Sequence, residues 1–256
     1  MKNTIIAAKI RFRGSKTFKS IKSKIDSLET TIAGIKFNVH PMDWSYWQTT
    51  HNGTWEPETI SIFRENLNEK TRYCDIGGWV GPTALLASAL GANVTCFEPD
   101  PNAYERLLHN IRINKSANIQ TFQIALAGVD GIRRIVPLGK SLGQSSSSIH
   151  IVPSGKESAG VLSLSWNTAC GLLKLPDFDF IKIDIEGGEM DLLPSMMDYI
   201  GEHRPKIFLS THLPFIAHES KEVYLKILSD LWKLYPGAPE FDINELGNSF
   251  PSYLLE

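Results

Sequence analysis

The fold of this chain is decided by residues 73–101, which read YCDIGGWVGPTALLASALGANVTCFEPDP. They predict a short strand ending near Asp75, a glycine-rich turn, a helix opened by Pro82, and a second strand that leads into Glu98. Glycines in the turn let a ligand approach the backbone, and an acid after the second strand can accept hydrogen bonds from ribose hydroxyl groups. The stretch therefore predicts a βαβ unit that holds a nucleoside.

The spacing of the glycines separates two classes of cofactor. A dinucleotide fingerprint, G-x-G-x-x-G, that starts at Gly77 would place its second glycine at the position of Trp79. Instead Asp75, Gly77 and Gly81 form the pattern D-x-G-x-x-x-G. That pattern resembles motif I of the class I S-adenosylmethionine (SAM) methyltransferases. The alternative interpretation is a glycine-rich turn that only joins a strand to a helix, and the acid at Glu98 argues against it.

Size and composition indicate a globular α/β protein. The chain has 256 residues, 42% of them hydrophobic and 21% charged, with a net charge of −2. This balance gives no overall attraction to nucleic acid, and we see neither an apolar run long enough to span a membrane nor a secretory leader. We interpret Cys74, Cys96 and Cys170 as reduced core thiols of a cytoplasmic protein.

Residues 1–30 are interpreted as a basic N-terminal arm. Residues 1–24 contain eight Lys or Arg and no acid, without the period of an amphipathic helix. Two interpretations stay open: a solvated arm, or an arm that makes peripheral contact with an anionic membrane surface or a partner.

A small region, 31–70, is expected to follow the arm. It should contain a strand at 31–39, an aromatic segment at 42–55 and a helix at 58–67. Aromatic side chains with polar neighbours cover a cofactor, bind a sugar face or form a lid that only packs, and the sequence leaves these alternatives open.

Residues 71–256 alternate between predicted strands and helices. Beyond the βαβ unit, we expect strands at 119–126, 178–184 and 206–211, an extra β segment at 132–138, a Ser-rich loop at 139–160 and a final hairpin around Gly247-Asn248. This alternation predicts a doubly wound, mostly parallel, seven-stranded α/β sheet of Rossmann-like type.

With these residues in view, the chain resembles the FkbM family of class I methyltransferases. The resemblance covers about residues 53–210, and its most specific piece is the run I-K-I-D-I-E-G-x-E from Ile181 to Glu189. The other matching residues are Trp55-Glu56-Pro57, Asp75-Ile76-Gly77, Gly81, the run from Phe97 to Pro101, Tyr104, Leu107, Asn110 and Ala125-Leu126. Members of the family methylate hydroxyl groups of sugars and polyketide-type natural products. The resemblance therefore implies a SAM-dependent O-methyltransferase with a glycan or small-molecule substrate.

Together, the motif and the resemblance imply a SAM site. Its predicted residues are Glu56, Asp75, Gly77, Gly78, Trp79, Gly81, Glu98, Pro99, Asp100, Ala125 and Asp184. The chain departs from the family pattern in three places: at Gly78-Trp79, where Ala-Asn is usual, at Leu164-Ser165, where Leu-Asp is usual, and at Ser210-Thr211-His212, where a Glu often ends the strand. Because of the last departure, the resemblance does not identify the catalytic base.

Methyl transfer to a neutral hydroxyl group needs a proton acceptor. We expect His212 to lie beside Asp184, because each follows a predicted strand at the edge where ligands bind in this fold. A histidine that titrates near pH 6–7 is the usual general base, so His212 is the first candidate and His218 the second, with Asp184 orienting the acceptor or the SAM amino group. Asp184, Glu186 and Glu189 could also hold Mg²⁺, an interpretation that we do not favour, or could serve only the structure.

Two other classes of function remain as alternatives. An NAD(P)-linked oxidoreductase or epimerase is disfavoured by the missing dinucleotide fingerprint and by the absence of a Tyr-x-x-x-Lys pair. A non-catalytic partner subunit with a SAM-binding fold is disfavoured by the intact motif residues. The acceptor and the oligomeric state are not fixed by the sequence.

Overall fold

The computed structural model describes residues 26–149, 157–240, 246 and 249–256. The chain separates into two compact units, Met1–Pro57 and Glu58–Glu256, and each is described by itself. The basic residues 1–24 and the expected turn at Gly247-Asn248 lie outside the described residues. In the part of the chain that is described, no helix has the length and apolar character needed to cross a membrane.

The first unit contains a β-hairpin where the sequence predicted one strand. β1 (Leu28–Ile32) pairs antiparallel with β2 (Ile35–Val39). The turn between them consists of Ala33 and Gly34, whose φ angles of 52° and 81° are the left-handed values that a two-residue hairpin turn requires. A short 3₁₀ helix, η2 (Pro41–Asp43), then leads into α3 (Trp44–His51), so much of the aromatic segment is helical.

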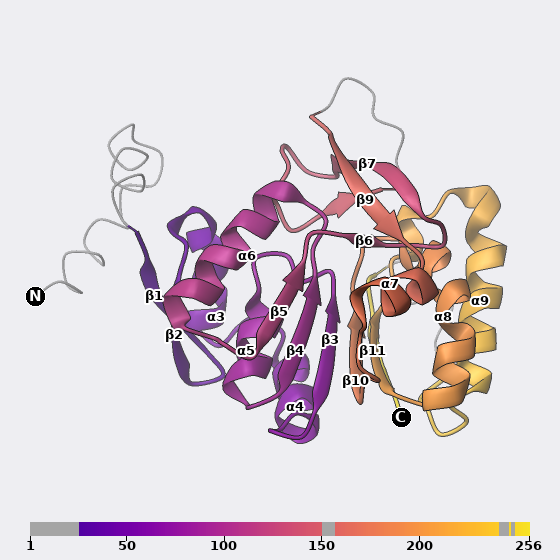
Figure 1. The fold of residues 1–256 in the computed structure, drawn as a ribbon, viewed down its shortest axis with the longest axis horizontal. Coiled ribbons are helices and arrows are strands. Elements are labelled where there is room, and N and C mark those ends of the chain that lie inside the picture. The colour runs from indigo at the N-terminus through magenta and orange to yellow at the C-terminus, as the bar shows by residue number, and fades with distance from the viewer. Residues whose placement is uncertain (1–25, 150–156, 241–245, 247–248) are drawn as a thin grey trace, which may run out of the picture. The chain divides into compact units, whose positions relative to one another are not determined.

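A central sheet organises the second unit (Figure 1). Its strand order is β12-β11-β10-β3-β4-β5, and every pair is parallel except β11 with β12. The strands are β3 (Arg72–Ile76), β4 (Asn93–Phe97), β5 (Ile119–Phe122), β10 (Phe180–Ile183), β11 (Lys206–Ser210) and β12 (Ser252–Leu255). The doubly wound, mostly parallel architecture is confirmed. The described sheet has six strands rather than seven, because only β12 of the expected final hairpin is present and residues 241–245 are not described.

A second sheet borders the carboxyl ends of the central strands. Its order is β6-β9-β7-β8, with β6 (Ala125–Leu126), β7 (Gly131–Pro137), β8 (Ser147–Ser148) and β9 (Ala159–Leu164). The extra β segment expected at 132–138 is confirmed as β7. The expected strand at 119–126 is divided between the two sheets, and β8 and the start of β9 lie in the region expected to be a loop.

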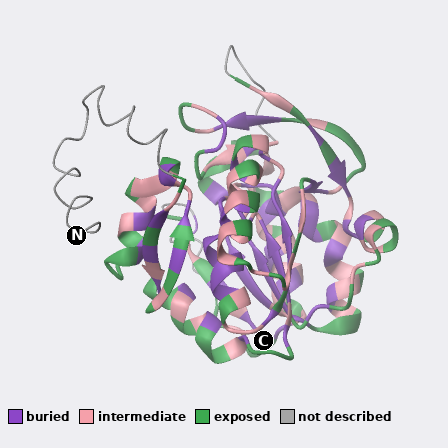
Figure 2. Ribbon diagram, turned by 60° about the vertical axis from the view of Figure 1, so that its left-hand side comes forward, coloured by how far each residue is buried: buried purple, intermediate pink, exposed green. Residues whose placement is uncertain are grey.

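Helices cover both faces of the central sheet. They are α4 (Pro57–Asn66), α5 (Pro82–Ala89), α6 (Pro101–Asn114), α7 (Trp166–Leu173), α8 (Glu189–His203) and α9 (Lys221–Lys233). Alternate strand residues face opposite ways: Cys74 and Ile181 belong to the core under α7, α8 and α9, whereas Tyr73 and Phe180 contact Phe63 of α4. Figure 2 shows this burial as purple strands beneath helices with green outer sides.

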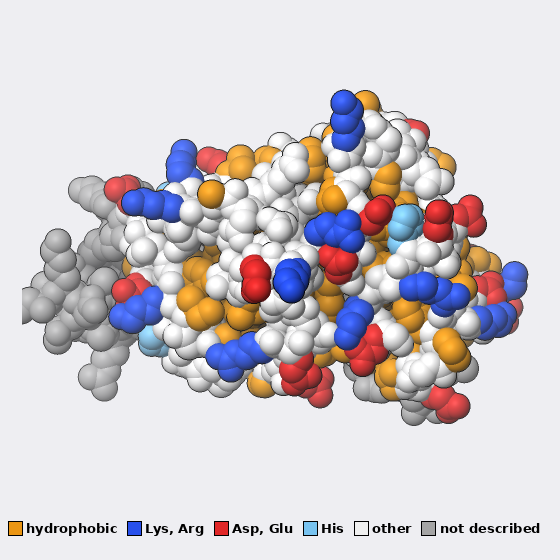
Figure 3. Space-filling view, turned by 60° about the horizontal axis from the view of Figure 1, so that its bottom comes forward, with side chains coloured by type: hydrophobic (Ala, Val, Ile, Leu, Met, Phe, Trp, Pro, Cys, Tyr) orange, Lys and Arg blue, Asp and Glu red, His pale blue; other side chains and the backbone are white. Residues whose placement is uncertain are grey.

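Charged side chains of both signs are interspersed on the face drawn in Figure 3. Cys74 and Cys96 are free thiols buried in β3 and β4, as predicted, while Cys170 on α7 is free but only partly buried.

Candidate active site

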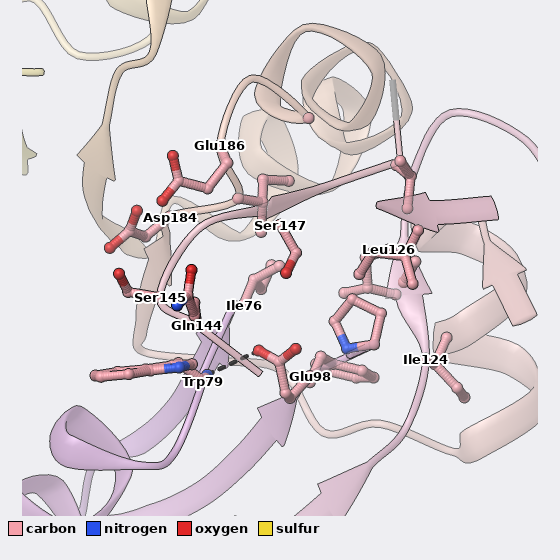
Figure 4. A pocket seen from close by; sticks show the side chains of 18 residues that line it. Ile76, Trp79, Glu98, Ile124, Leu126, Gln144, Ser145, Ser147, Asp184 and Glu186 are labelled. Atoms are coloured by element: carbon pink, nitrogen blue, oxygen red, sulfur yellow. Dashed lines mark hydrogen bonds between the residues drawn. The ribbon is translucent and has the colours of Figure 1, made fainter. Parts of the chain in front are cut away.

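A cavity opens at the carboxyl-end edge of the central sheet, between the ends of β3, β4 and β10 and the second sheet (Figure 4). It encloses about 620 Å³, its open mouth included. Six residues predicted for the cofactor line it: Gly77, Trp79, Glu98, Pro99, Ala125 and Asp184. Glu186 lines it as well, together with Gln144, Ser145 and Ser147 from the loop after β7.

Glycines are required in the turn after β3 because the backbone there approaches its neighbours closely. Gly77 has a φ of +87°, and a Cβ at this position would lie 1.9 Å from the Asp184 carbonyl oxygen. A Cβ on Gly78 would lie 2.1 Å from Cys96 Sγ, and one on Gly81, also left-handed, 2.6 Å from Leu107 Cδ1. Gly78 and Gly81 therefore shape the turn and its packing, and neither lines the cavity.

Beneath the turn, Lys182 lies between two carboxylates. Its Nζ atom is 3.0 Å from Asp184 Oδ2 and 3.9 Å from Asp75 Oδ1, and its side chain is only 4% exposed. Asp75 is fully buried, and its Oδ2 atom accepts a hydrogen bond from the Thr83 hydroxyl group. Asp75 thus holds Lys182 and α5 from below the cavity and does not line it.

Lys182 was not predicted as a site residue, although the sequence carried a signal. It is the one charged residue within the strand F-I-K-I of β10, and lysine is rarely buried unless it is paired. Burial opposes ionisation of Asp184, but the charges of Lys182 and His212 lower its pKa below the ordinary value. Lys182 therefore keeps a carboxylate ionised at the cavity wall.

Glu98 is held mainly by backbone groups. Its Oε2 atom accepts a hydrogen bond from the Trp79 amide (2.8 Å, dashed in Figure 4) and its Oε1 atom one from the Asp100 amide (2.7 Å). Burial raises the pKa of Glu98 to about 8, although both amides oppose this. Glu98 is therefore mostly protonated at neutral pH and still lines the cavity.

Asp100 anchors the loop that forms one wall of the cavity. Its Oδ1 atom caps α6, while its Oδ2 atom accepts hydrogen bonds from the Gly143 amide (2.6 Å) and the Ser147 hydroxyl group (2.9 Å). The Gly143 carbonyl group in turn accepts from Trp79 Nε1 (3.0 Å) and from Arg106. Trp79 and Asp100, both predicted to bind the cofactor, thus fix the loop in place, and Asp100 itself does not line the cavity.

His212 lies among the three acids that follow β10. Its Nδ1 atom is 2.7 Å from Glu189 Oε1, and its Nε2 atom is 3.5 Å from Asp184 Oδ1 and 3.6 Å from Glu186 Oε2. Parallel pairing of β10 with β11 brings these segments together, as expected. Glu189 is fully buried, and its Oε1 atom also accepts from the Ile185 amide.

The charge state of His212 differs from the expectation of a histidine that titrates near 6–7. Burial alone would lower the pKa of His212, but the charge and hydrogen bond of Glu189, with the charges of Asp184 and Glu186, raise it to about 9. The imidazole is therefore protonated at neutral pH. The sequence indicated each of these residues but not how completely the carboxylates would surround the ring.

Two predicted site residues stay apart from this group. His218 is exposed on η4 (His218–Ser220) and does not line the cavity. Glu56 belongs to the first unit, so its role in cofactor binding stays a prediction. Among the described residues, no three His, Cys, Asp or Glu side chains are arranged to hold a metal ion.

Comparison with known proteins gives a consistent family. The family model described as the methyltransferase FkbM domain matches residues 73–232. Hexuronic acid methyltransferase AglP from Haloferax volcanii is 24% identical over 153 residues, which are 55% of this chain and 56% of that protein. The chain thus spans about half the length of this curated relative.

Two solved structures align with this chain at TM-scores below 0.5. An FkbM methyltransferase from Methylobacillus flagellatus KT aligns with a TM-score of 0.47 and 16% identity, covering 84% of this chain and 53% of that one. Aeropyrum pernix fibrillarin, solved with SAM bound, aligns with a TM-score of 0.42 and 12% identity, covering 75% of this chain and 68% of that one.

Proposed function

Because the chain belongs to the FkbM family of methyltransferases, we propose that it transfers the methyl group of SAM to a hydroxyl group of a sugar or glycosylated metabolite. The observation that carries this proposal is the order of groups along the cavity. Ile124 and Leu126 lie at one end, Asp184 and Glu186 lie at the other, and Glu98 lies between them (Figure 4). This order suits an adenine ring, a ribose and a charged amino-acid tail in turn.

The residues fit SAM by their chemistry. Ile124 and Leu126 offer an apolar surface to the adenine, Glu98 accepts hydrogen bonds from the ribose hydroxyl groups, and Asp184 accepts from the ammonium group of the tail or orients the acceptor. When bound, SAM supplies an electrophilic methyl group on its sulfonium sulfur. The name of the Haloferax volcanii relative, a hexuronic acid methyltransferase, supports a sugar acceptor.

His212 is proposed as the general base. Its Nε2 atom points toward Asp184 and Glu186, two residues that line the cavity, while Glu189 holds Nδ1. Only the neutral imidazole can accept the proton of a hydroxyl group. Because the pKa of His212 is raised to about 9, kcat should rise with pH toward a limb near 9 and not near 6–7.

A turnover assay tests the proposed function. The protein is incubated with SAM and a panel of neutral hexosides and hexuronides, and methylated products are detected by mass. We expect His212→Ala to lower kcat by roughly 10²–10⁴-fold, while the SAM Kd stays within about threefold of wild type.

Other outcomes of this assay would change the assignment. Loss of turnover in His218→Ala with full turnover in His212→Ala would move the base to His218. A limb below pH 6 that persists in His212→Ala would assign a carboxylate instead. Loss of turnover with EDTA would show that the reaction needs a metal ion and would overturn the assignment of His212 as the sole activator of the hydroxyl group.

A further inference from the structure

Two exposed aromatic rings lie beside His212. Phe215 ends the 3₁₀ helix η3 (Leu213–Phe215), which follows β11, and Phe250 precedes β12. The ring centroids of Phe215 and Phe250 are 4.9 Å apart, and each ring also faces the imidazole of His212, at 6.0 Å and 5.4 Å respectively. The imidazole and the Phe215 ring are almost parallel, at 6°. The three rings pack in one cluster, with the imidazole buried and the two phenyl rings exposed; we call this cluster the ring platform.

The fold does not account for the exposure of these two rings. Phe215 is 38% exposed and Phe250 is 49% exposed, whereas their neighbours Leu213 and Ile216 are buried in the main core. Single exposed apolar side chains are ordinary on protein surfaces. Two adjacent phenyl rings against a buried, charged imidazole are a different case, because the rings, tilted by 37° to each other, offer a concentrated apolar surface next to a candidate catalytic group.

The ring platform adjoins the acidic end of the cavity. Asp184 and Glu186 line the cavity, and the same two carboxylates approach His212 Nε2. The succession in space is therefore the cavity, the two carboxylates, the imidazole and the phenyl rings. An acceptor that rests on the rings would place its hydroxyl groups toward the carboxylates and Nε2.

We propose that Phe215 and Phe250 form the acceptor subsite, and that it takes the apolar face of a pyranose ring. The C–H groups on one face of the sugar pack on the phenyl rings, while its hydroxyl groups donate to Asp184 and Glu186. An ionised carboxylate accepts hydrogen bonds but cannot donate them, so Asp184 and Glu186 suit a ligand with several hydroxyl donors. This inference rests on the proposed function and names the substrate class of the same site.

Leucine substitutions test the subsite. Phe215→Leu and Phe250→Leu keep an apolar side chain but remove the flat ring. With wild-type turnover established on a methyl hexoside, each variant should raise the acceptor KM by roughly threefold to tenfold, in line with the strength of aromatic contacts. kcat should change less than KM, and the SAM Kd should stay within about twofold. Leu172→Ala, at an exposed apolar position on α7, should leave KM unchanged.

A binding measurement gives a second readout. Saturation-transfer NMR with the methyl hexoside and S-adenosylhomocysteine should show contact with the sugar C–H groups in wild type, and that contact should be lost in the double leucine variant. Wild-type turnover with an unchanged acceptor KM in the double variant would overturn this inference and leave the proposed function standing. An unchanged KM with an altered melting temperature or oligomeric state would assign the rings to a protein contact instead. Failure of wild type to methylate any sugar would overturn both.

Discussion

Two acids that line the cavity, Glu98 and Asp184, are held in opposite ways. Glu98, at the end of β4, accepts hydrogen bonds from two backbone amides, and burial raises its pKa to about 8. Asp184, after β10, is paired with Lys182 and lies near His212, and these charges lower its pKa despite burial. One sheet edge thus carries a mostly neutral acid and an ionised one.

The surroundings of the two carboxyl groups explain the difference. Amide hydrogen bonds favour the ionised form but do not offset the loss of water around Glu98, which is 6% exposed. The Asp184 side chain keeps 34% exposure and has the charges of Lys182 and His212 beside it, and these favour its ionised form. Under the proposed function, the ionised Asp184 suits the cationic tail and the reacting hydroxyl group, whereas Glu98 must lose its proton to accept hydrogen bonds from both ribose hydroxyl groups.

Removal of Lys182 should have the largest effect. Lys182→Met would leave Asp75 and Asp184 without their shared buried cation, and loss of one partner of a buried ion pair costs about 3–5 kcal/mol. Urea unfolding measures this. The control is Lys233→Met, which removes an exposed pair with Asp230 and should cost about 0–1 kcal/mol. Equal losses in the two variants would show that the charge of Lys182 does not hold this end.

Gly77→Ala should have the next largest effect, because Gly77 follows β3 and its backbone lies against the backbone of Asp184, which follows β10. Its φ of +87° and the 1.9 Å approach of a Cβ to the Asp184 carbonyl oxygen both exclude a side chain without a backbone shift. Backbone strain of this kind costs about 1–3 kcal/mol. Gly201→Ala, in α8 with open space around the Cβ, is the control and should be neutral or stabilising by about 0.5–1 kcal/mol. A Gly77→Ala variant as stable as wild type would show that β10 can move away from the turn.

Glu189→Gln should shift the titration of His212. The amide can still accept from Nδ1, but the negative charge is gone, so the pKa of His212 should fall from about 9 toward the ordinary value near 6.5. Proton NMR of the imidazole across pH 5–10 measures the shift, which should be at least about one unit. Glu186→Gln, whose charge contributes less, should shift it in the same direction but by less. An unchanged titration in both variants would refute the role given to these carboxylates.

The sequence predicted this edge in outline because strand ends and turns leave strong local signals. The pattern Asp75, Gly77, Gly81 fixed the βαβ unit, and the I-K-I-D-I-E-G run placed its acids at a strand end, as observed. The β1–β2 hairpin was missed because Ala33-Gly34 is a weak turn signal within an alternating segment.

What the sequence could not give depends on pairing between distant segments. The loop anchored on Asp100 joins residues more than forty positions apart, and Phe215 meets Phe250 only through the pairing of β11 with β12. The pKa of His212 follows from three carboxylates that converge on one ring. Composition and spacing report none of these distances.

The smallest effect is expected at Glu98, and it concerns how the nucleoside affinity depends on pH. Ribose hydroxyl groups donate to a carboxylate, so the ionised form of Glu98 is the binding form in the proposed site. Because the pKa of Glu98 is raised to about 8, Glu98 is ionised in about half of the molecules at pH 8 and in about a tenth of them at pH 7. Nucleoside affinity should therefore fall roughly fivefold as the pH falls from 8 to 7.

The probe for this measurement is 5′-methylthioadenosine, which carries the ribose without the titrating amino-acid tail of SAM. Calorimetry at the two pH values should show the fivefold change in wild type and none in Glu98→Gln, whose amide accepts hydrogen bonds at either pH. Glu186→Gln, at the other end of the cavity, should keep the wild-type dependence. A flat profile in wild type would mean that Glu98 does not change its charge between pH 7 and 8 or does not hold the ribose, and a pH titration of the Glu98 carboxyl group by NMR would separate the two.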